Sequence, residues 1–576
     1  MRRVIWRVQD ARVVVLGLVL ILAWSGIGYR LFQVQGADAA ELTQRGFDQR
    51  VRHEEILPKR GTIYDRDGIE LAVTVYGSSL VADPALIDDP AAAAALIGPL
   101  IGANIADVAV KLESDGRYVL LARRLENSQE AVLAAAIEES ELDGFSFVEE
   151  LIRVYPSGSL AAPVLGLTRL DDGAGIEGIE AIMDGTLAGR PGKRIVERDA
   201  AGRAIPQGEL LIDPATPGSD VILTLDREIQ YTAEQVLGKT IDETGSVGGS
   251  VIVMVPSTGR ILAMVSLPGF DPNDRSGLDP ATLRNRAVAD VYEPGSTLKV
   301  VTVSAALELG IVEPSTMIET PHEVEVGDEV FEDHANFPSE MTVADVVAKS
   351  SNVGTIEIQR RLGNEQHYAF LDAYGLGRQA SIDFNTEAAG VLDHYTTWCR
   401  STCGASAAIG YGIGATPIQM AGVYATIANG GEWVEPHVVA EIIGPDGERV
   451  VTEPRRREVI SAETAGLMLT MLRGVVERGT GRRASIDGFS VGGKTGTSRK
   501  FDVEQGAYSE DLTIAWFVGI APIDDPAIVI AVVLDSPIGV LDDGTQLKFG
   551  GASAAPVFAA IAESALNQLG VAPDED

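Results

Sequence analysis

A run of 17 uncharged, mostly apolar residues near the N-terminus constrains this chain more than any other feature. It reads VVVLGLVLILAWSGIGY and lies between Arg12 and Arg30. A helix of this length can span the apolar part of a bilayer when flanking arginines extend toward the headgroups. The sequence therefore predicts a cytoplasmic tail over residues 1–12 and a transmembrane anchor over residues 13–32.

The charges around this run indicate its orientation. Four arginines precede it, at positions 2, 3, 7 and 12. Such a bias favours a cytoplasmic N-terminus and an exported body in the cell membrane, although arginines also follow the run. A cleaved signal peptide is the alternative, with Ala37-Asp38-Ala39 as a small-residue site, but that site lies far beyond the end of an unusually long apolar run. No later segment is apolar for long enough to span, so we expect a single-pass protein.

Composition excludes several classes of protein. The chain has 576 residues, too many for one compact core, and 83 acidic against 46 basic side chains give a formal charge of -37. This charge would repel phosphates, so no nucleic-acid partner is expected. The six histidines show no ligand spacing, and no metal or other cofactor is predicted. Cys399 and Cys403 form either one local disulfide or two free thiols.

Patterning divides the exported part in two. Residues 33–215 mix short strand-like runs, turns and an alanine-rich helical stretch at 90–102. Residues 216–570 begin with a strand and a hairpin, continue with helical stretches and end with strands, which predicts an antiparallel sheet completed by both ends of the domain and covered by helices. The segments are 220–230 and 250–266 at the start, helices near 296–309, 341–362, 416–429 and 461–477, and strands near 489–498, 512–520 and 527–535. Residues 571–576 are expected to be a disordered tail.

The segment EPGSTLKVV places a lysine in the first turn of an apolar helix, three residues after a serine. Residues i and i+3 share a helix face, so Lys299 can approach the hydroxyl of Ser296. Burial lowers the pKa of a lysine, and a second cation nearby lowers it further. A neutral amine could then accept the serine proton, although a serine and a lysine at this spacing also occur by chance.

Two later segments could complete such a site. KSSNVGT supplies Ser350 and Asn352, which alone would suggest a helix cap. GGKTGTSRK supplies a candidate second cation and a glycine that admits a close backbone approach; its residues are Lys494, Thr495, Gly496 and Thr497. Their order and their separations of 54 and 144 residues make the combination far more specific than its parts.

This set resembles the SxxK, SxN and KTG boxes of the penicillin-recognising serine acyltransferases. Further segments resemble class B penicillin-binding proteins along nearly the whole chain. They are PKRGTIYDRDGIELAVT (58–74), RVYPSGSLAAPVLG (153–166), GIEGIEAIMDGTLAGRPG (175–192) and IGYGIGATPIQMAGVYATIANGG (409–431). SSNVGT is more like the septal, FtsI-type branch than the elongation branch.

The resemblance implies an α+β fold. The pedestal, or dimerisation, domain would occupy residues 33–215, and the transpeptidase domain residues 216–570. The latter is expected to contain a five-stranded antiparallel sheet flanked by helices, with an all-helical subdomain.

The resemblance also implies a role for each site residue. Ser296 would attack the D-Ala-D-Ala bond of a peptidoglycan stem peptide, Lys299 would take its proton, and Ser350 would protonate the leaving amine. The residues that would bind the substrate are Asn352, Lys494, Thr495, Gly496 and Thr497. The backbone N–H groups of Ser296 and Thr497 would form the oxyanion hole.

The implied partners are peptidoglycan stem peptides or their lipid-linked precursor, β-lactams, an FtsW-like glycosyltransferase of the SEDS family and other division proteins. The alternatives are an elongation-specific transpeptidase, a D,D-carboxypeptidase or β-lactamase-like hydrolase, and an inactive division scaffold. Two charged segments are assigned to solvent: Arg455 to Arg457 are interpreted as a solvated turn, and residues 322–334 as a solvated acidic hairpin.

Overall fold

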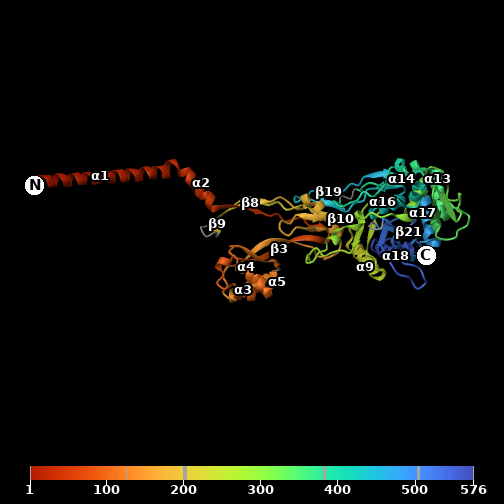
Figure 1. Ribbon diagram of the computed structural model, residues 1–576, viewed down its shortest axis with the longest axis horizontal. Helices are drawn as coiled ribbons and strands as arrows, with labels where there is room; N and C mark the ends of the chain where they lie inside the picture. Colours follow the sequence, from red (N-terminus) through yellow and green to blue (C-terminus); the bar gives the residue numbers. More distant parts are fainter. Residues whose placement is uncertain (1, 126, 199–203, 381–383, 503–505, 575–576) are drawn as a thin grey trace. The chain divides into compact units, whose positions relative to one another are not determined.

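The computed structural model describes residues 2–125, 127–198, 204–380, 384–502 and 506–574 (Figure 1). The chain divides into two compact units. The first comprises Met1–Pro58 and Gly189–Pro217, and the second comprises Lys59–Ala188 and Gly218–Asp576.

The first unit begins with the predicted anchor. Helix α1 (Arg2–Phe32) covers it and continues through a short π-helical turn (Gln33–Ala37) into α2 (Ala39–Arg50). Within the described residues, the segment Ala11–Ala37 is the one helix long and apolar enough to cross a membrane. An antiparallel sheet completes the unit, in the order β1 (Val51–Ile56), β8 (Gly192–Arg198), β9 (Ala204–Asp213).

A seven-stranded sheet begins the second unit and crosses the predicted boundary at residue 215. Its order is β19 (Arg449–Val451), β18 (Val439–Ile443), β10 (Asp220–Leu223), β2 (Ile63–Tyr64), β3 (Glu70–Ala82) and β4 (Val119–Leu125), with β5 (Phe145–Val154) also paired to β3. Strand β10 pairs with β2 on one side and with β18 on the other. Segments from both predicted domains therefore share one sheet, and the boundary itself stays a prediction.

Three helices pack on β3, β4 and β5, and a separate apolar core lies between these helices and strands. They are α3 (Pro90–Leu100), α4 (Ile105–Leu112) and α5 (Asn127–Glu139). Helix α3 matches the alanine-rich stretch predicted at 90–102. Its start is fixed because the Asp89 side chain accepts a hydrogen bond from Ala92 N and a proline follows immediately.

A buried ion cluster joins the three segments that carry the pedestal resemblance. Arg60 Nε and Arg153 Nε each donate to the Glu180 carboxylate at 2.6 Å, and the hydroxyl of Tyr155 lies 3.3 Å from it. Glu180 is fully buried. A buried carboxylate is tolerated because two guanidinium groups balance it, so these distant segments must pack together. Short elements surround the cluster: α6 (Ala162–Leu165), β6 (Leu167–Thr168), β7 (Gly175–Glu177), α7 (Gly178–Ile182) and α8 (Asp184–Leu187).

The predicted five-stranded antiparallel sheet lies at the centre of the second unit. Its order is β12 (Ile261–Leu267), β11 (Gly248–Met254), β23 (Ile528–Asp535), β22 (Ala507–Ala521) and β21 (Gly492–Asp502). The first hairpin and the last three strands pair as the sequence pattern predicts, because β11 adds to β23. Strand β21 is left at the edge of the sheet.

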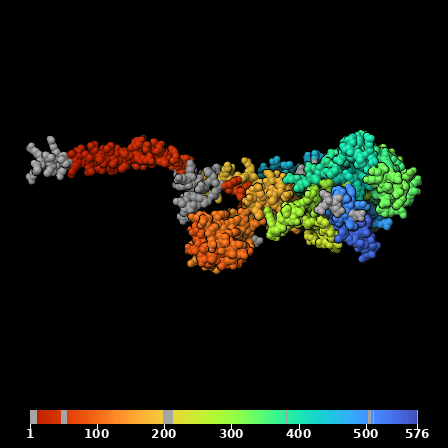
Figure 2. Space-filling model, viewed as in Figure 1, coloured from red at the N-terminus to blue at the C-terminus, as the bar shows by residue number. Residues whose placement is uncertain are grey.

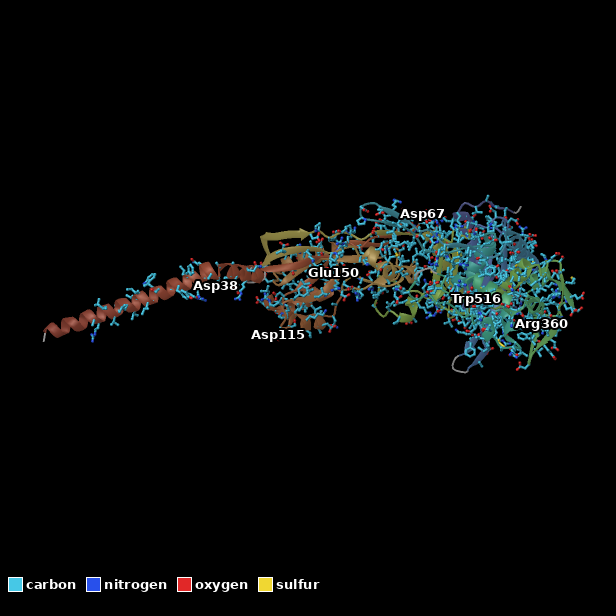
Figure 3. The ribbon with its side chains drawn as sticks, turned by 90° about the horizontal axis from the view of Figure 1, so that it is seen from above. Asp38, Asp67, Asp115, Glu150, Arg360 and Trp516 are labelled. Atoms are coloured by element: carbon cyan, nitrogen blue, oxygen red, sulfur yellow. A yellow bond between two sulfur atoms is a disulfide. The ribbon has the colours of Figure 1, made fainter. Side chains whose placement is uncertain are left out.

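Helices cover both faces of this sheet (Figure 1). Successive strand residues point to opposite faces, so Val251 contributes to one core while Ile252 contributes to the other. Helices α9 (Arg227–Thr244) and α18 (Gly550–Gln568) pack on the first face; α11 (Lys299–Glu308), α16 (Pro417–Ala428) and α17 (Ala462–Arg478) pack mainly on the second. Trp516 of β22 is completely buried in the second core (Figure 3).

A mainly helical region lies between β12 and α16 and is green in Figure 2. Its helices are α10 (Arg286–Ala289), α11, α12 (Val343–Lys349), α13 (Asn352–Leu362), α14 (Asn364–Ala373) and α15 (Cys403–Ala408). Two small sheets accompany them, β13 (Met317–Glu319) with β16 (Glu340–Thr342) and β14 (Glu323–Val326) with β15 (Glu329–Glu332). The subdomain is thus predominantly rather than entirely helical.

The chain end corrects one expectation. Asp574 accepts hydrogen bonds from the backbone N–H of Ser490, at 2.7 Å, and from its hydroxyl, and donates its own N–H to Gly488 O at 3.0 Å. The predicted disordered tail is therefore wrong for residues 571–574, because the Asp574 carboxylate accepts both hydrogen bonds of Ser490, which lies just before β21.

Candidate active site

Ser296 lies in a tight turn at the start of α11. A 3-10 turn spans Gly295–Leu298, and Lys299 begins the α-helix. Thr297 Oγ1 donates to Pro294 O at 2.7 Å, and the Tyr424 hydroxyl from α16 donates to Thr297 O at 2.9 Å. Ser296 is half-buried whereas its neighbours in the turn are buried. Its side chain is therefore the one that the turn leaves accessible.

Strand β21 and a glycine-rich segment pack directly against this turn. A Cβ atom added to Gly496 would lie 2.7 Å from Pro294 O, and one added to Gly410 would lie 2.1 Å from Gly295 O. Gly295 has φ +53°, and a Cβ there would lie 3.2 Å from Thr497 O. Glycine at these positions permits backbone contact, which brings the Lys494–Thr497 segment beside Ser296.

Ser350 and Asn352 reach the site through a break between two helices, where the sequence suggested a helix cap. The stretch 341–362 was expected to be one helix, but α12 ends at Lys349 and α13 begins at Asn352. Ser350 has φ +60°, a left-handed conformation rarely adopted by residues other than glycine. The hydroxyl of Ser351 accepts from Gly354 N at 2.9 Å and caps α13. Such local strain is common at functional sites.

Lys299 is buried and contacts this break. Its Nζ donates to Ser350 O and to Asn352 Oδ1, both at 2.7 Å, and lies 3.4 Å from Ser350 Oγ. Only 1% of the residue is exposed. Burial lowers the pKa of Lys299 to about 7, against an opposing effect from Asp333. Three acceptors thus lie within reach of Lys299 Nζ, and the two carbonyl oxygens are the nearer ones. A neutral amine that donates to these two keeps one lone pair.

Lys494 approaches Ser350 from β21. Its Nζ donates to Ser350 Oγ at 2.8 Å and to Thr495 O at 3.1 Å. The residue is completely buried, and this burial together with nearby Lys299 holds the pKa of Lys494 well below its usual value. Because Ser350 Oγ accepts a hydrogen bond from Lys494, its own proton remains available for a third group.

The threonines of β21 have separate partners. Thr495 Oγ1 lies 2.6 Å from Thr480 Oγ1, and Thr497 Oγ1 accepts from Gly550 N at 3.1 Å. Thr497 is only half-buried. Since β21 is an edge strand, an extended peptide could add to it through main-chain hydrogen bonds.

Asp333 is a site residue that sequence reasoning missed. It lies just beyond the acidic β14–β15 hairpin, interpreted from sequence as solvated, but is only 5% exposed. Ser351 Oγ donates to it at 2.7 Å and Val353 N at 3.3 Å, and Asn352 N also donates to it. The interpretation is therefore wrong at this end. No sequence signal links an acidic residue to a helix N-terminus 18 residues later.

Replacing Asp333 tests its electrostatic role. Because the negative charge raises the pKa of Lys299, Asp333→Asn is expected to shift the pH dependence of the acylation that the family resemblance implies: the decline in rate at acid pH should move to lower pH by up to about one unit. Stopped-flow measurements with a fluorescent penicillin over a pH series would measure the shift. Glu332→Gln, an exposed neighbour on the same hairpin, should leave this decline in place. If the acid-side decline of the rate occurred at the same pH in Asp333→Asn as in the parent, this role would be refuted.

The cysteines and the glycine-rich segment lie at opposite ends of α15. Cys399 is joined by a disulfide to Cys403, the first residue of α15, with their Cα atoms 5.3 Å apart. Gly412 N and the Tyr508 hydroxyl both donate to Glu293 Oε1, at 2.7 and 2.8 Å. Of the two possibilities that the sequence left open, a local disulfide or two free thiols, the structure has the disulfide.

Comparison with known families matches most of the chain. Residues 249–563 match the family described as "Penicillin binding protein transpeptidase domain", and residues 55–223 match "Penicillin-binding Protein dimerisation domain". The first match contains every site residue discussed above.

Individual relatives and a solved structure agree with these matches. The chain is 32% identical over 569 residues to the probable peptidoglycan D,D-transpeptidase PenA of Neisseria meningitidis, covering 98% of this chain and 94% of the relative. It is 31% identical over 568 residues to the peptidoglycan D,D-transpeptidase FtsI of Escherichia coli, covering 96% and 91%. Its structure is similar to that of penicillin binding protein 3 from Mycobacterium tuberculosis complexed with ampicillin, with a TM-score of 0.72, 30% identity, and coverage of 91% of this chain and 98% of that one.

Proposed function

Since the chain belongs to the class B penicillin-binding proteins, the family of the peptidoglycan D,D-transpeptidases, we propose that it cross-links stem peptides through an ester formed on Ser296. The observation that carries this proposal is the contact set of Lys299. If the buried amine is neutral and directs its two N–H bonds at the two nearest acceptors, both carbonyl oxygens, its lone pair is left to accept a proton.

In the acylation step, Ser296 Oγ attacks the carbonyl carbon of the D-Ala-D-Ala bond. Lys299 accepts the hydroxyl proton, and the bond to the terminal D-alanine nitrogen breaks. Ser350 transfers its proton to that leaving amine and takes the proton held by Lys299, which is neutral again; its position between Lys299 and Lys494 supports this role. The backbone N–H groups of Ser296 and Thr497 stabilise the oxyanion.

Substrate binding uses the edge strand. Gly496 keeps β21 open for the donor peptide, and Asn352 binds the peptide backbone. The terminal carboxylate is held by Lys494, Thr495 and Thr497. Support comes from the close approach of this segment to the serine turn and from the unpaired edge of β21. β-Lactams would acylate the same serine.

An amine of a neighbouring stem peptide then resolves the ester. Its nitrogen bonds to the carbonyl carbon as the ester C–O bond breaks, and its proton returns to Ser296 Oγ. A cross-link forms rather than a hydrolysed peptide. The class A β-lactamase route would instead use a glutamate to activate water, and no Glu-x-x-Asn or Glu-x-x-x-Leu-Asn pattern follows Ser350 in the sequence.

We also infer the cellular setting. The apolar helix anchors the protein in the cell membrane, the N-terminus is cytoplasmic, and the catalytic domain is extracytoplasmic. Residues 33–215 form the pedestal and residues 216–570 the transpeptidase domain. The SSNVGT segment supports septal synthesis over elongation, with an FtsW-like glycosyltransferase supplying glycan strands and other division proteins as partners. A fluorescent fusion at midcell would agree with this inference; one along the side wall would contradict it.

The catalytic proposal is tested on the full chain in detergent micelles. A fluorescent penicillin should give a single adduct, located at Ser296 by peptide mapping. A D-alanyl thioester substrate with a D-amino acid as acceptor should yield the transfer product. Adduct on another residue would exclude the assigned nucleophile, and hydrolysis without transfer would identify a carboxypeptidase.

A further inference from the structure

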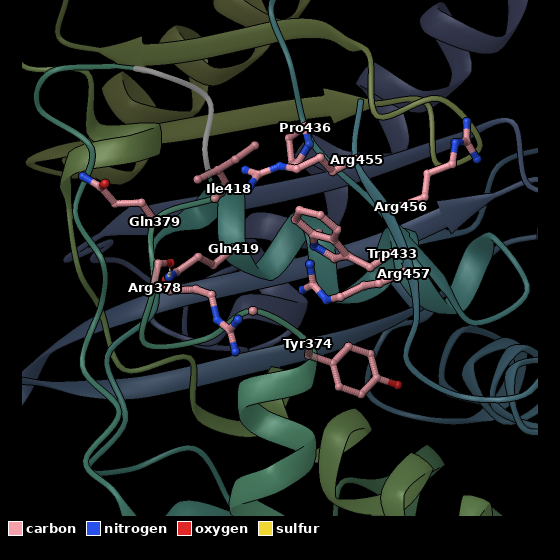
Figure 4. Close-up of a pocket in the computed structure, with 13 residues that line it drawn as sticks. Tyr374, Arg378, Gln379, Ile418, Gln419, Trp433, Pro436, Arg455, Arg456 and Arg457 are labelled. Carbon is pink, nitrogen blue, oxygen red and sulfur yellow. Dashed lines mark hydrogen bonds between the residues drawn. The ribbon is translucent and has the colours of Figure 1, made fainter. Parts of the chain in front are cut away.

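A basic pocket lies apart from the catalytic residues, between α16 and a small two-stranded sheet (Figure 4). The sheet pairs β17 (Glu432–Val434) with β20 (Arg456–Glu458). The pocket has a volume of about 260 Å³. Its polar lining consists of Arg378, Gln379, Gln419, Arg455, Arg456 and Arg457. The interpretation of Arg455 to Arg457 as a solvated turn holds for the exposed Arg455 and Arg456 but is wrong for Arg457, which is half-buried in a strand beside this cavity.

Arg457 is held in a fixed orientation. Its guanidinium carbon lies 3.6 Å from the centre of the Trp433 ring, and its Nε and Nη2 donate to Ala373 O at 3.1 and 3.0 Å. Among the described residues it forms no ion pair. Burial, and then the like charge of Arg378, lower the pKa of Arg457 to about 10, so it stays protonated at neutral pH. A fixed cation without a carboxylate partner favours an incoming anion.

The other arginines of the pocket are paired, so one positive charge is in excess. Arg378 pairs with Asp372, Arg455 pairs with Glu435, and Arg456 pairs with Glu432. The backbone of Arg378 is also fixed, because Gln419 Nε2 donates to its carbonyl oxygen at 2.7 Å. Four guanidinium groups thus meet three carboxylates, on a chain whose formal charge is -37. Such a local reversal of sign attracts anions that the rest of the surface repels.

We propose that this pocket binds a small oxyanion, either a phosphate or a carboxylate group, between Arg457 and Arg378. Guanidinium groups bind both anions through paired, charge-assisted hydrogen bonds. The cavity is near the lower end of the sizes typical of ligand pockets, so the ligand is small. The Gln379 and Gln419 amides are bonded to the surrounding backbone and fix the wall of the pocket rather than its ligand.

The test adds increasing amounts of the full chain, in micelles, to one of two probes and measures how far the NMR signal of the probe broadens on binding. The probes are inorganic phosphate, followed by phosphorus NMR, and labelled acetate, followed by carbon NMR. Ionic strength is held at roughly 0.15 M, where long-range attraction is screened beyond about 8 Å. We expect saturable binding of at least one probe. Arg457→Gln and Arg378→Gln should each weaken it by about tenfold or more, because each removes charge-assisted hydrogen bonds.

Arg449→Gln is the matched control, since Arg449 is exposed, pairs with Glu441 on β18 and does not line the pocket. It should retain full affinity. Thermal unfolding of each variant confirms that it is folded. Phosphate binding alone would identify a phosphorylated ligand, and acetate binding alone a carboxylate ligand. Binding of neither probe, or equal affinity in all three variants, would overturn the proposal.

Discussion

Ser296→Ala is expected to abolish covalent labelling by a fluorescent penicillin. Without the hydroxyl oxygen no ester can form, so labelling should fall to the background of boiled protein. The described structure records no hydrogen bond from the Ser296 side chain, and surface substitutions without such contacts usually change the free energy of unfolding by less than about 0.5 kcal/mol. Gel fluorescence measures the labelling, and thermal unfolding shows that the variant remains folded.

A second serine, Ser350, lies close to the amines of Lys299 and Lys494, so the Ser296→Ala variant also decides which of the two serines is the nucleophile. Ser350 Oγ lies within hydrogen-bond distance of Lys494 and 3.4 Å from Lys299. If Ser296→Ala still formed an adduct at the normal rate, Ser350 would be the alternative nucleophile. Ser350→Ala is expected to slow labelling without abolishing it, which separates a proton relay from an attacking group.

Lys299→Arg is expected to lower the acylation rate by roughly 10²–10⁴-fold, the usual contribution of a general base. Arginine keeps the positive charge and the donors, but it cannot lose its proton at any workable pH. It therefore separates the proposed proton transfer from simple hydrogen bonding to Ser350 O and Asn352 Oδ1. Stopped-flow fluorescence with excess penicillin gives the rate.

Lys349→Arg is a matched control for this change. Lys349 is the last residue of α12, next to Ser350 in sequence, and its ammonium lies 5.9 Å from the centre of the Phe337 ring. The same substitution there should leave acylation within about twofold of the parent, as expected for a change away from the reacting groups. Wild-type acylation in Lys299→Arg would exclude Lys299 as the base.

Local patterns in the sequence predicted most of the architecture. The first hairpin and the three last strands of the central sheet follow from continuous apolar runs bounded by turns, and the same rules placed α16 and α17. The seven-stranded sheet was less predictable, because β10 pairs with β2 about 160 residues earlier and with β18 about 220 residues later. No local propensity encodes such pairing.

The candidate site, too, was predictable from the sequence only in part. Ser296, Lys299, Ser350, Asn352 and Lys494 could be selected from spacing and from the resemblance. The polar residues of this segment suggested a helix cap, but the left-handed backbone at Ser350 could not be predicted, because such a conformation is rare for a serine. Asp333 and Arg457 were assigned to solvent because charged residues usually lie there. Asp333 is buried and Arg457 half-buried because each contacts partners distant in sequence.

The central claim is that Lys299 is uncharged when it activates Ser296, and the pH dependence of acylation tests it most directly. Because the pKa of Lys299 is lowered to about 7, the second-order rate constant with penicillin should fall about tenfold per pH unit below that value and level off above it. The measurement uses the full chain in micelles from about pH 5 to about pH 9. A limb near pH 7 is the predicted result, whereas a rate that is flat across this range, or that keeps rising toward the ordinary lysine pKa, would contradict the account.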